Sequence, residues 1–352
     1  MTTTPTSPSV RLCSPADVLA ATPYLLGFHP SESLVILGIR GRGLRFHVRG
    51  DLPDDRADGE VLAESYAGLF KHHRVEGVVL IGYGTAERAE PLLSATREAM
   101  RIRGIEIQDV LRAHEGRYWS LECGSPECCP PEGRPYDPVT SAVAVEATFA
   151  GMVALPDRNA VVRSLDGPTG PELVAIEDAA DRASLRLVRQ VTGRNVRKAV
   201  LEAGVAALDE AVTRYADGQR LTDDEVAWLV TLLHVVAFRD RAWKRIDGDG
   251  EEGRRVHLAL WADLVRRSEP ALAAPVAVLL AYVCWRAGDG LRASIAVDRA
   301  LDADPVYSAA RLMAEILDRA IPPSDLPPAS LSGAHGRPRP ARRRRAARRR
   351  KY

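Results

Sequence analysis

The segment from residue 28 to residue 33 concentrates side chains that can do chemistry. His29, Ser31, Glu32 and Ser33 bring an imidazole, a carboxylate and two hydroxyl groups close together in the chain. Such groups can transfer protons or bind a polar ligand. A structural turn is the alternative, because His29 precedes a proline and is held extended, and serine hydroxyls often bond to backbone groups in turns. The candidate ligand-binding residues here are Phe28, His29, Ser31 and Ser33 of this segment, together with Tyr24 just before it.

Three cysteines form a second group of reactive side chains. Cys123, Cys128 and Cys129 could bind zinc, with His114 as a fourth ligand, or could form a redox-sensitive disulfide. The spacing differs from that of the common zinc knuckles, and two adjacent cysteines do not easily face one metal ion. We therefore expect that the protein binds no metal and needs no cofactor, and that the thiols pack in a proline-rigidified loop at 123–131.

A glycine-containing turn provides the third candidate. Gly82 and Gly84 follow a predicted buried strand and precede a predicted helix, so that their backbone amides could approach a phosphate group. The segment lacks the third glycine of a dinucleotide fingerprint and the lysine of a P-loop, which favours a plain strand-to-helix turn. Strand ends of open α/β sheets often bind ligands, so a pocket is expected between this turn and His29.

A capped helix positions the His29 segment. Ser14 has the residue type of an N-cap, with Pro15 at the first helical position and Asp17 in the first turn. Pro23 and Gly27 predict the end of this helix. The loop that follows holds His29 just before a predicted strand.

Hydrophobic periodicity in the first half of the chain is typical of an α/β fold. Apolar runs predict buried strands, one alternating run predicts a half-exposed strand, and the order predicts a mixed sheet with covering helices. The predicted elements are strands at 34–39 and 44–48, a helix at 61–72, a strand at 77–82, a helix at 87–103, and strands at 105–111 and 118–121.

The second half predicts helices only. Thr222 and Glu225 form a capping-box pattern, and the stretch 275–305 resembles one tetratricopeptide-type helical hairpin. A Pro/Gly-rich interval at 167–171 marks the expected boundary between domains. The predicted helices span about 175–192, 195–217, 223–243, 255–268, 276–287, 290–303 and 306–320. The predicted organisation is a flexible N-terminus at 1–11, an α/β domain at 12–166, a helical domain at 172–321, and a disordered Pro-rich and basic tail at 322–352.

Charge is distributed unevenly along the chain. Residues 337–351 contain ten lysines or arginines and no acidic residue, so the rest of the chain has 38 basic against 47 acidic side chains, a net charge of −9. The tail is expected to bind polyanions without sequence preference. With five cysteines, no apolar run of about 18 residues and no signal-like N-terminus, we expect a cytoplasmic protein without a disulfide framework or a membrane span.

Several segments resemble an uncharacterised actinobacterial family that carries a domain of unknown function. They are Ser14–Asp17, the Pro-Tyr-Leu-Leu-Gly-Phe-His-Pro sequence at 23–30, and Ser33–Val35. The cysteine loop at 123–131 is also similar to what that family has at this position. Because the family has no assigned activity, the resemblance implies no reaction, catalytic residue or partner.

These observations favour a non-enzymatic protein that binds a ligand or a protein partner, the partner through the helical domain. Two alternatives remain open: a hydrolase or group-transfer enzyme that uses His29, and a nucleic-acid-associated factor that acts through the basic tail. The sequence contains no P-loop, no dinucleotide fingerprint and no His-Glu-x-x-His motif.

Overall fold

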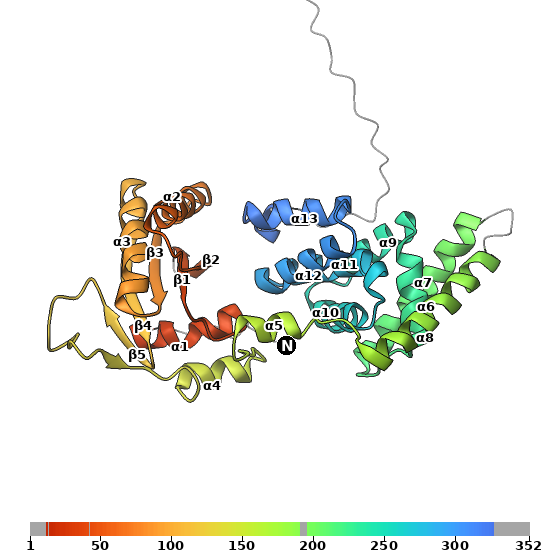
Figure 1. The fold of residues 1–352 in the computed structure, drawn as a ribbon, viewed down its shortest axis with the longest axis horizontal. Helices are drawn as coiled ribbons and strands as arrows, with labels where there is room; N and C mark the ends of the chain where they lie inside the picture. The colour runs from red at the N-terminus through yellow and green to blue at the C-terminus, as the bar shows by residue number, and fades with distance from the viewer. Residues whose placement is uncertain (1–11, 13, 42, 191–195, 327–352) are drawn as a thin grey trace, which may run out of the picture.

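The computed structural model describes residues 12, 14–41, 43–190 and 196–326. The predicted N-terminal segment 1–11 and the basic segment 337–351 lie outside the described residues. Within the described ranges, a β-sheet with its covering helices lies at one end of the molecule and a group of long helices at the other (Figure 1).

The first half of the chain forms the predicted mixed sheet. It has six strands in the order β2-β1-β3-β4-β5-β6, in which only β3 and β4 run parallel. The antiparallel β1–β2 hairpin is confirmed. The strands are β1 (Ser33–Arg40), β2 (Gly43–Asp51), β3 (Gly77–Tyr83), β4 (Glu106–His114), β5 (Arg117–Ser120) and β6 (Arg134–Pro135).

Both faces of the central strands are covered, which explains their continuous apolar runs. Leu34 and Ile36 of β1 pack with residues of α2 (Arg56–His72) and α3 (Ala86–Ile102). The alternate residues Val35 and Leu37 belong to the larger hydrophobic cluster on the other face, together with Leu19 and Leu26 of α1 (Pro15–Leu26). That larger cluster continues into the helical half of the chain.

The helix α1 begins as expected and ends later than expected. The Ser14 side chain accepts a hydrogen bond from the amide of Asp17, and Gly27 caps the C-terminus in the left-handed conformation with φ = 80°. The prediction that Pro23 ends the helix is wrong, since the helix runs through it to Leu26. Pro23 has no amide hydrogen to donate within the helix. Pro23 and Leu26 are both buried against the core, and this packing outweighs the lost hydrogen bond.

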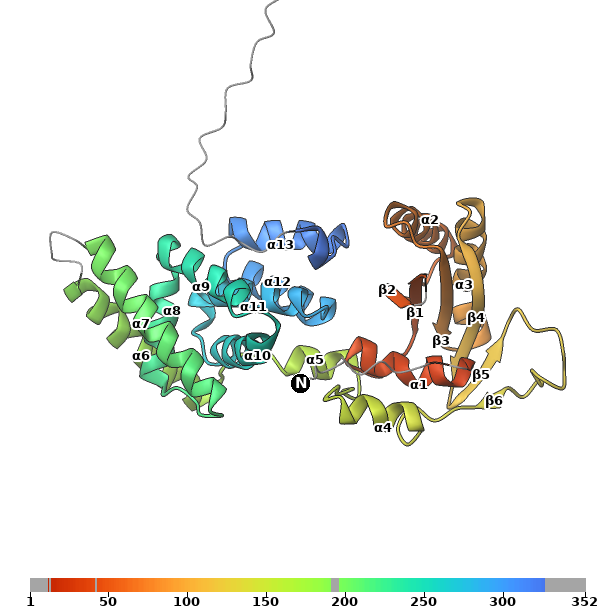
Figure 2. The ribbon, with the colours of Figure 1, turned by 180° about the vertical axis from the view of Figure 1, so that it is seen from behind.

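Two short helices connect the halves, and neither is predicted from the sequence. They are α4 (Ala142–Phe149) and α5 (Arg158–Arg163). Between them, Leu155 pairs with Phe28 in an isolated parallel bridge. Figure 2 shows α5 between the sheet region and the long helices.

The second half is helical, as predicted, but several boundaries differ. The helices predicted to begin at about 175 and 255 begin at Gly170 and Gly250. The predicted helix at 223–243 is two helices, because Val235 has an extended backbone with φ = −82° and ψ = 107°. This break turns Phe238 into the core beside Gly204. The helices are α6 (Gly170–Gln190), α7 (Val196–Ala216), α8 (Asp223–Leu233), α9 (Val236–Gly248), α10 (Gly250–Arg266), α11 (Ala274–Arg286), α12 (Gly290–Ala303) and α13 (Ser308–Asp318).

The helix α11 is the centre of the helical half. Every residue from Ala274 to Trp285 is buried, and a turn at Gly288, with φ = 81°, leads into α12. The likeness of this hairpin to a tetratricopeptide unit and the division into domains at 12–166 and 172–321 stay predictions. Over the described part of the chain, no helix combines the length and the apolar character that crossing a membrane requires.

Candidate ligand-binding cleft

Two adjoining cavities lie beside α10, bordered by the segment that follows α5 and by the turn between α7 and α8. Their volumes are about 490 and 460 Å³, within the range of small-molecule sites. Arg220, Asp263 and Arg266 line both cavities, so these three side chains form the wall between them.

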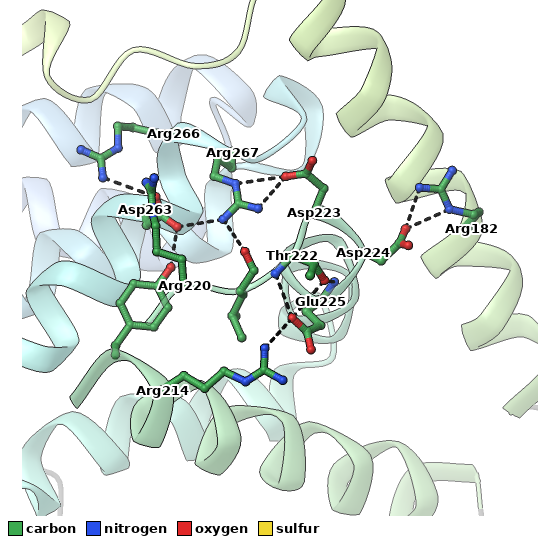
Figure 3. Close-up of polar contacts among 12 residues, drawn as sticks. Arg182, Arg214, Arg220, Thr222, Asp223, Asp224, Glu225, Asp263, Arg266 and Arg267 are labelled. Carbon is green, nitrogen blue, oxygen red and sulfur yellow. Dashed lines mark hydrogen bonds and ion pairs between the residues drawn. The ribbon is translucent and has the colours of Figure 1, made fainter. Parts of the chain in front are cut away.

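Asp263 is the centre of this wall. It is one of the buried residues of α10, in a stretch that also buries Trp261 and Leu264, and is only 1% exposed. Its carboxylate accepts hydrogen bonds from the phenol of Tyr215, from Nη2 of Arg220 and from Nη1 of Arg267, the last at 2.9 Å (Figure 3). A weaker contact of 3.5 Å comes from Nη2 of Arg266. The buried charge is therefore fully compensated.

The hydrogen bonds keep Asp263 ionised. Burial by itself raises the pKa of this carboxyl group, but the bonds from Tyr215, Arg267 and Arg220 outweigh burial, and the net pKa lies below its ordinary value. Burial and the bond to Asp263 raise the pKa of the Tyr215 phenol. Asp263 therefore acts as a fixed negative charge that holds its donors in place.

The arginines around Asp263 differ in how many of their N–H groups form hydrogen bonds within the protein. Arg267 also donates to the Asp223 carboxylate and, at 2.9 Å, to the carbonyl of Leu221, and its side chain is nearly buried. The side chains of Arg220 and Arg266 are 64% and 42% exposed, and the contact with Asp263 uses one nitrogen of each. Both side chains are therefore partly open to solvent at the cleft that they line.

The cavity of about 460 Å³ combines charge with an apolar lining. Arg292 adds a third guanidinium group, and the apolar part is formed by Leu165, Leu258 and Leu280. Cys284 also lines this cavity, but burial raises the pKa of its thiol strongly, so that it stays protonated at neutral pH. The arrangement fits a small molecule that has an anionic group and an apolar part.

His29 lies away from this cleft, in the first half of the chain. Its amide donates to the carbonyl of Leu155 at 2.9 Å, and burial lowers the pKa of its imidazole. Phe28 is only 2% exposed and packs in the core. The side chain of Tyr24 on α1 is half-buried.

The serines of the His29 segment have different environments. Ser31 is exposed, and its carbonyl accepts a hydrogen bond of 3.5 Å from Arg49. Ser33 is fully buried and lies opposite Tyr83 in the pairing of β1 with β3. Its hydroxyl group has no hydrogen-bond partner within the described chain.

The glycine turn lies beside Glu32, at the end of the His29 segment. Gly84 has φ = 150°, and a Cβ atom there would lie 3.1 Å from Oε1 of Glu32. Its amide already donates to the carbonyl of Ala113. At Gly82 a Cβ atom would lie 2.9 Å from that of Ala89, so this glycine allows α3 to approach the sheet closely. As ligand-binding residues, this set stays a prediction.

The three cysteines converge in the loop between β5 and β6. Their sulfur atoms all lie within 4.8 Å of one another, and all three thiols are unpaired. The steric argument against adjacent cysteines that face one point is therefore wrong for this loop. A hydrogen bond from the backbone of Ser125 lowers the pKa of Cys123, whereas burial raises that of Cys129 to about 11. The lowered pKa means that Cys123 ionises more readily than Cys129.

Comparison with protein families places this chain in one of them. Residues 15–324 match the domain of unknown function DUF4192. The chain belongs to the DUF4192 family. No curated protein and no solved structure matches the chain.

The DUF4192 match includes the arginine cleft, which the sequence analysis does not identify. Several separate segments meet to form it: the residues that follow α5, the turn between α7 and α8, α10, and individual residues of α6, α11 and α12. One sequence signal does indicate the site. Asp263 stands in the apolar stretch Leu258–Val265 of α10, and a carboxylate at a buried helical position requires partners.

Proposed function

We propose that this DUF4192 protein is a non-enzymatic binding protein and that its arginine cleft binds a small anionic ligand with an apolar part. The observation that carries the proposal is the pair Arg220 and Arg266. Both line the two cavities, both have partly exposed side chains, and both are held by the buried carboxylate of Asp263.

The local charge supports an anion. In the cavity of about 460 Å³, three arginines, at positions 220, 266 and 292, stand against the carboxylate of Asp263 and that of Asp289, which pairs with Arg292, and this leaves one positive charge in surplus. Guanidinium groups bind carboxylate and phosphate groups with two parallel hydrogen bonds. Asp166 and Glu172 line the cavity of about 490 Å³, so the anionic group is expected on the side of Arg292.

The protonation states support binding rather than catalysis. The Cys284 thiol has a raised pKa, as does the Tyr215 phenol, while Asp263 has a lowered one. Each of the three shifts moves the pKa away from 7, so none of these groups is prepared for proton transfer near neutral pH. His29 is not among the residues that line either cavity. The cleft therefore does not support the alternative of an enzyme that uses His29.

Calorimetric titration of the full-length protein tests this proposal. We expect phenyl phosphate to bind more tightly than inorganic phosphate, because only the former fills the apolar lining. An Arg220→Gln/Arg266→Gln double variant should bind phenyl phosphate at least about tenfold more weakly, since charge-assisted hydrogen bonds are lost.

The matched control is Arg56→Gln, at an exposed position of α2. All three proteins keep the basic tail, so its contribution to anion binding is the same in each. Equal affinity of the double variant and the control would refute the proposal. Melting temperatures within a few degrees of the parent protein show that the variants are folded.

A further inference from the structure

The thiol loop has the geometry of a built site rather than of three scattered cysteines. Cys123, Cys128 and Cys129 lie between β5 and β6, and their sulfur atoms are mutually within 4.8 Å. Cys128 is exposed, and the other two are half-buried, so the cluster is open to solvent on one side.

A turn explains how neighbouring cysteines come to face the same point. The carbonyl of Ser125 accepts hydrogen bonds from the amide of Cys128 at 3.1 Å and from the amide of Cys129 at 2.8 Å. In an extended strand, successive side chains point to opposite sides. The tight turn at Ser125 removes that alternation, and Cys123 closes the group from the other end of the loop.

Contacts with the sheet and with α3 hold the first end of the loop. Glu122, next to Cys123, forms ion pairs with Arg97 at 2.9 Å and Arg101 at 3.3 Å. Its side chain and that of Arg97 are only about one-third exposed, at 32% each. The amide of Leu121 donates to Val110 on β4.

The second end of the loop is held by β5. The indole of Trp119 donates to the carbonyl of Pro131 at 2.9 Å, and Arg117 donates to the carbonyl of Gly133 at 2.9 Å. The Arg112 guanidinium stacks on the Trp119 ring, 3.6 Å from its centre, and so fixes the indole. The three thiols are therefore positioned before any ligand binds.

We propose that Cys123, Cys128 and Cys129 bind one zinc ion through three thiolates, with water in the fourth position. At a Zn–S bond length of about 2.3 Å, tetrahedral geometry places the sulfurs about 3.8 Å apart. The observed separations, all within 4.8 Å, need little adjustment to reach this. Each thiol that binds releases its proton to solvent, so zinc uptake acidifies the medium. The expectation of a metal-free protein depended on the spacing of the three cysteines in the sequence. The closeness of their sulfur atoms in space removes that argument.

Zinc titration of the reduced full-length protein under anaerobic conditions tests the site. A chromophoric zinc chelator reports competition, and we expect one zinc per chain. Cys123→Ser and Cys128→Ser should each weaken binding by more than about 100-fold, because even changes outside the ligand set cost about 10- to 100-fold. Cobalt in place of zinc should give a thiolate-to-metal charge-transfer band that is absent in Cys123→Ser.

Two control variants test whether the two remaining cysteines contribute to zinc binding. Cys284→Ala, in the core of the helical half, and Cys13→Ser should both keep full zinc uptake. Loss of zinc in either control overturns the three-thiolate assignment. So does a reduced parent protein that takes up no zinc, or a Cys128–Cys129 disulfide that persists under reducing conditions.

Discussion

Nη1 of Arg267 lies 2.9 Å from Oδ2 of Asp263, and this ion pair is almost completely buried. The same guanidinium group also bonds to Asp223, at the start of α8, and to the carbonyl of Leu221. The pair therefore ties α10 to the beginning of α8. Removing one charge of such a pair costs more than the pair contributes, because its partner is left buried and uncompensated.

Replacing Asp263 by asparagine should destabilise the protein strongly. We expect Asp263→Asn to lower the free energy of unfolding by about 3 kcal/mol, since the nearly buried Arg267 loses one of its two carboxylate partners and keeps only Asp223. Urea denaturation measures the change. Asp217→Asn, at an exposed position, should change the free energy by less than about 0.5 kcal/mol. A loss below about 1 kcal/mol in Asp263→Asn would mean that the pair does not stabilise the wall of the cleft.

Two glycine substitutions should have opposite effects. In Gly204→Ala the new methyl group would lie 2.6 Å from Cδ2 of Phe238, a fully buried ring. Such overpacking should lower the free energy of unfolding by about 1–3 kcal/mol. Gly68→Ala lies within α2 and has no atom within 4 Å of the added Cβ, so it should stabilise by up to about 1 kcal/mol. Urea midpoints of both variants test the packing of Phe238, and equal shifts would contradict it.

Stability should fall as the pH decreases below about 6.5, partly because of His257. Burial lowers the pKa of this histidine in the folded protein, although its bond with Asp249, at 2.9 Å, opposes the shift. Its Nδ1 atom is buried without a partner among the described residues, which disfavours a second ring proton. Below its ordinary pKa of 6.5, the unfolded chain therefore binds a proton that the folded chain resists.

The pH effect is measured as the difference in the free energy of unfolding between pH 7.5 and pH 5.5. His29, His47 and His234 also have lowered pKa values, so the parent protein shows their combined effect. His257→Gln should show a smaller difference than the parent protein. An identical pH dependence in the two proteins would exclude His257 as a contributor.

Zinc affinity should depend on Trp119, although this residue does not contact the metal. Trp119→Phe keeps an aromatic ring under Arg112 but removes the N–H group that holds the Pro131 carbonyl. We expect about tenfold weaker zinc binding, as for other groups that support a ligand set. Trp243→Phe, in the helical half, is the control and should leave the affinity unchanged. Unchanged affinity in Trp119→Phe would show that the thiols are positioned without this anchor.

Much of the secondary structure follows from local patterns. Alternating and continuous apolar runs predicted the strands, and residue type alone predicted the caps at Ser14 and Thr222, both of which are confirmed. The errors occur where packing overrides local preference. Pro23 lies inside a helix because it is buried, and Val235 breaks a predicted helix where Phe238 enters the core.

The candidate sites show the same division. The cysteine loop and the His29 segment are contiguous in the chain, so the sequence alone reveals which groups they contain. It does not reveal that three sulfurs converge, because that depends on a turn around the carbonyl of Ser125. It also misses the arginine cleft, because Arg220 and Asp263 are 43 residues apart.

By itself, then, the sequence determined the mixed sheet, the helical second half and the local groups that could react. Periodicity and capping act over a few residues, and these features depend on little else. The tertiary structure decided which of those groups lie together and which are enclosed. In the sequence, Asp263 is an ordinary carboxylate. It becomes the buried centre of a cleft only because Tyr215 and Arg220 approach from other parts of the chain and Arg267 from the next turn of its own helix. Such charge compensation requires contacts between distant segments, and it exists only once the chain has folded.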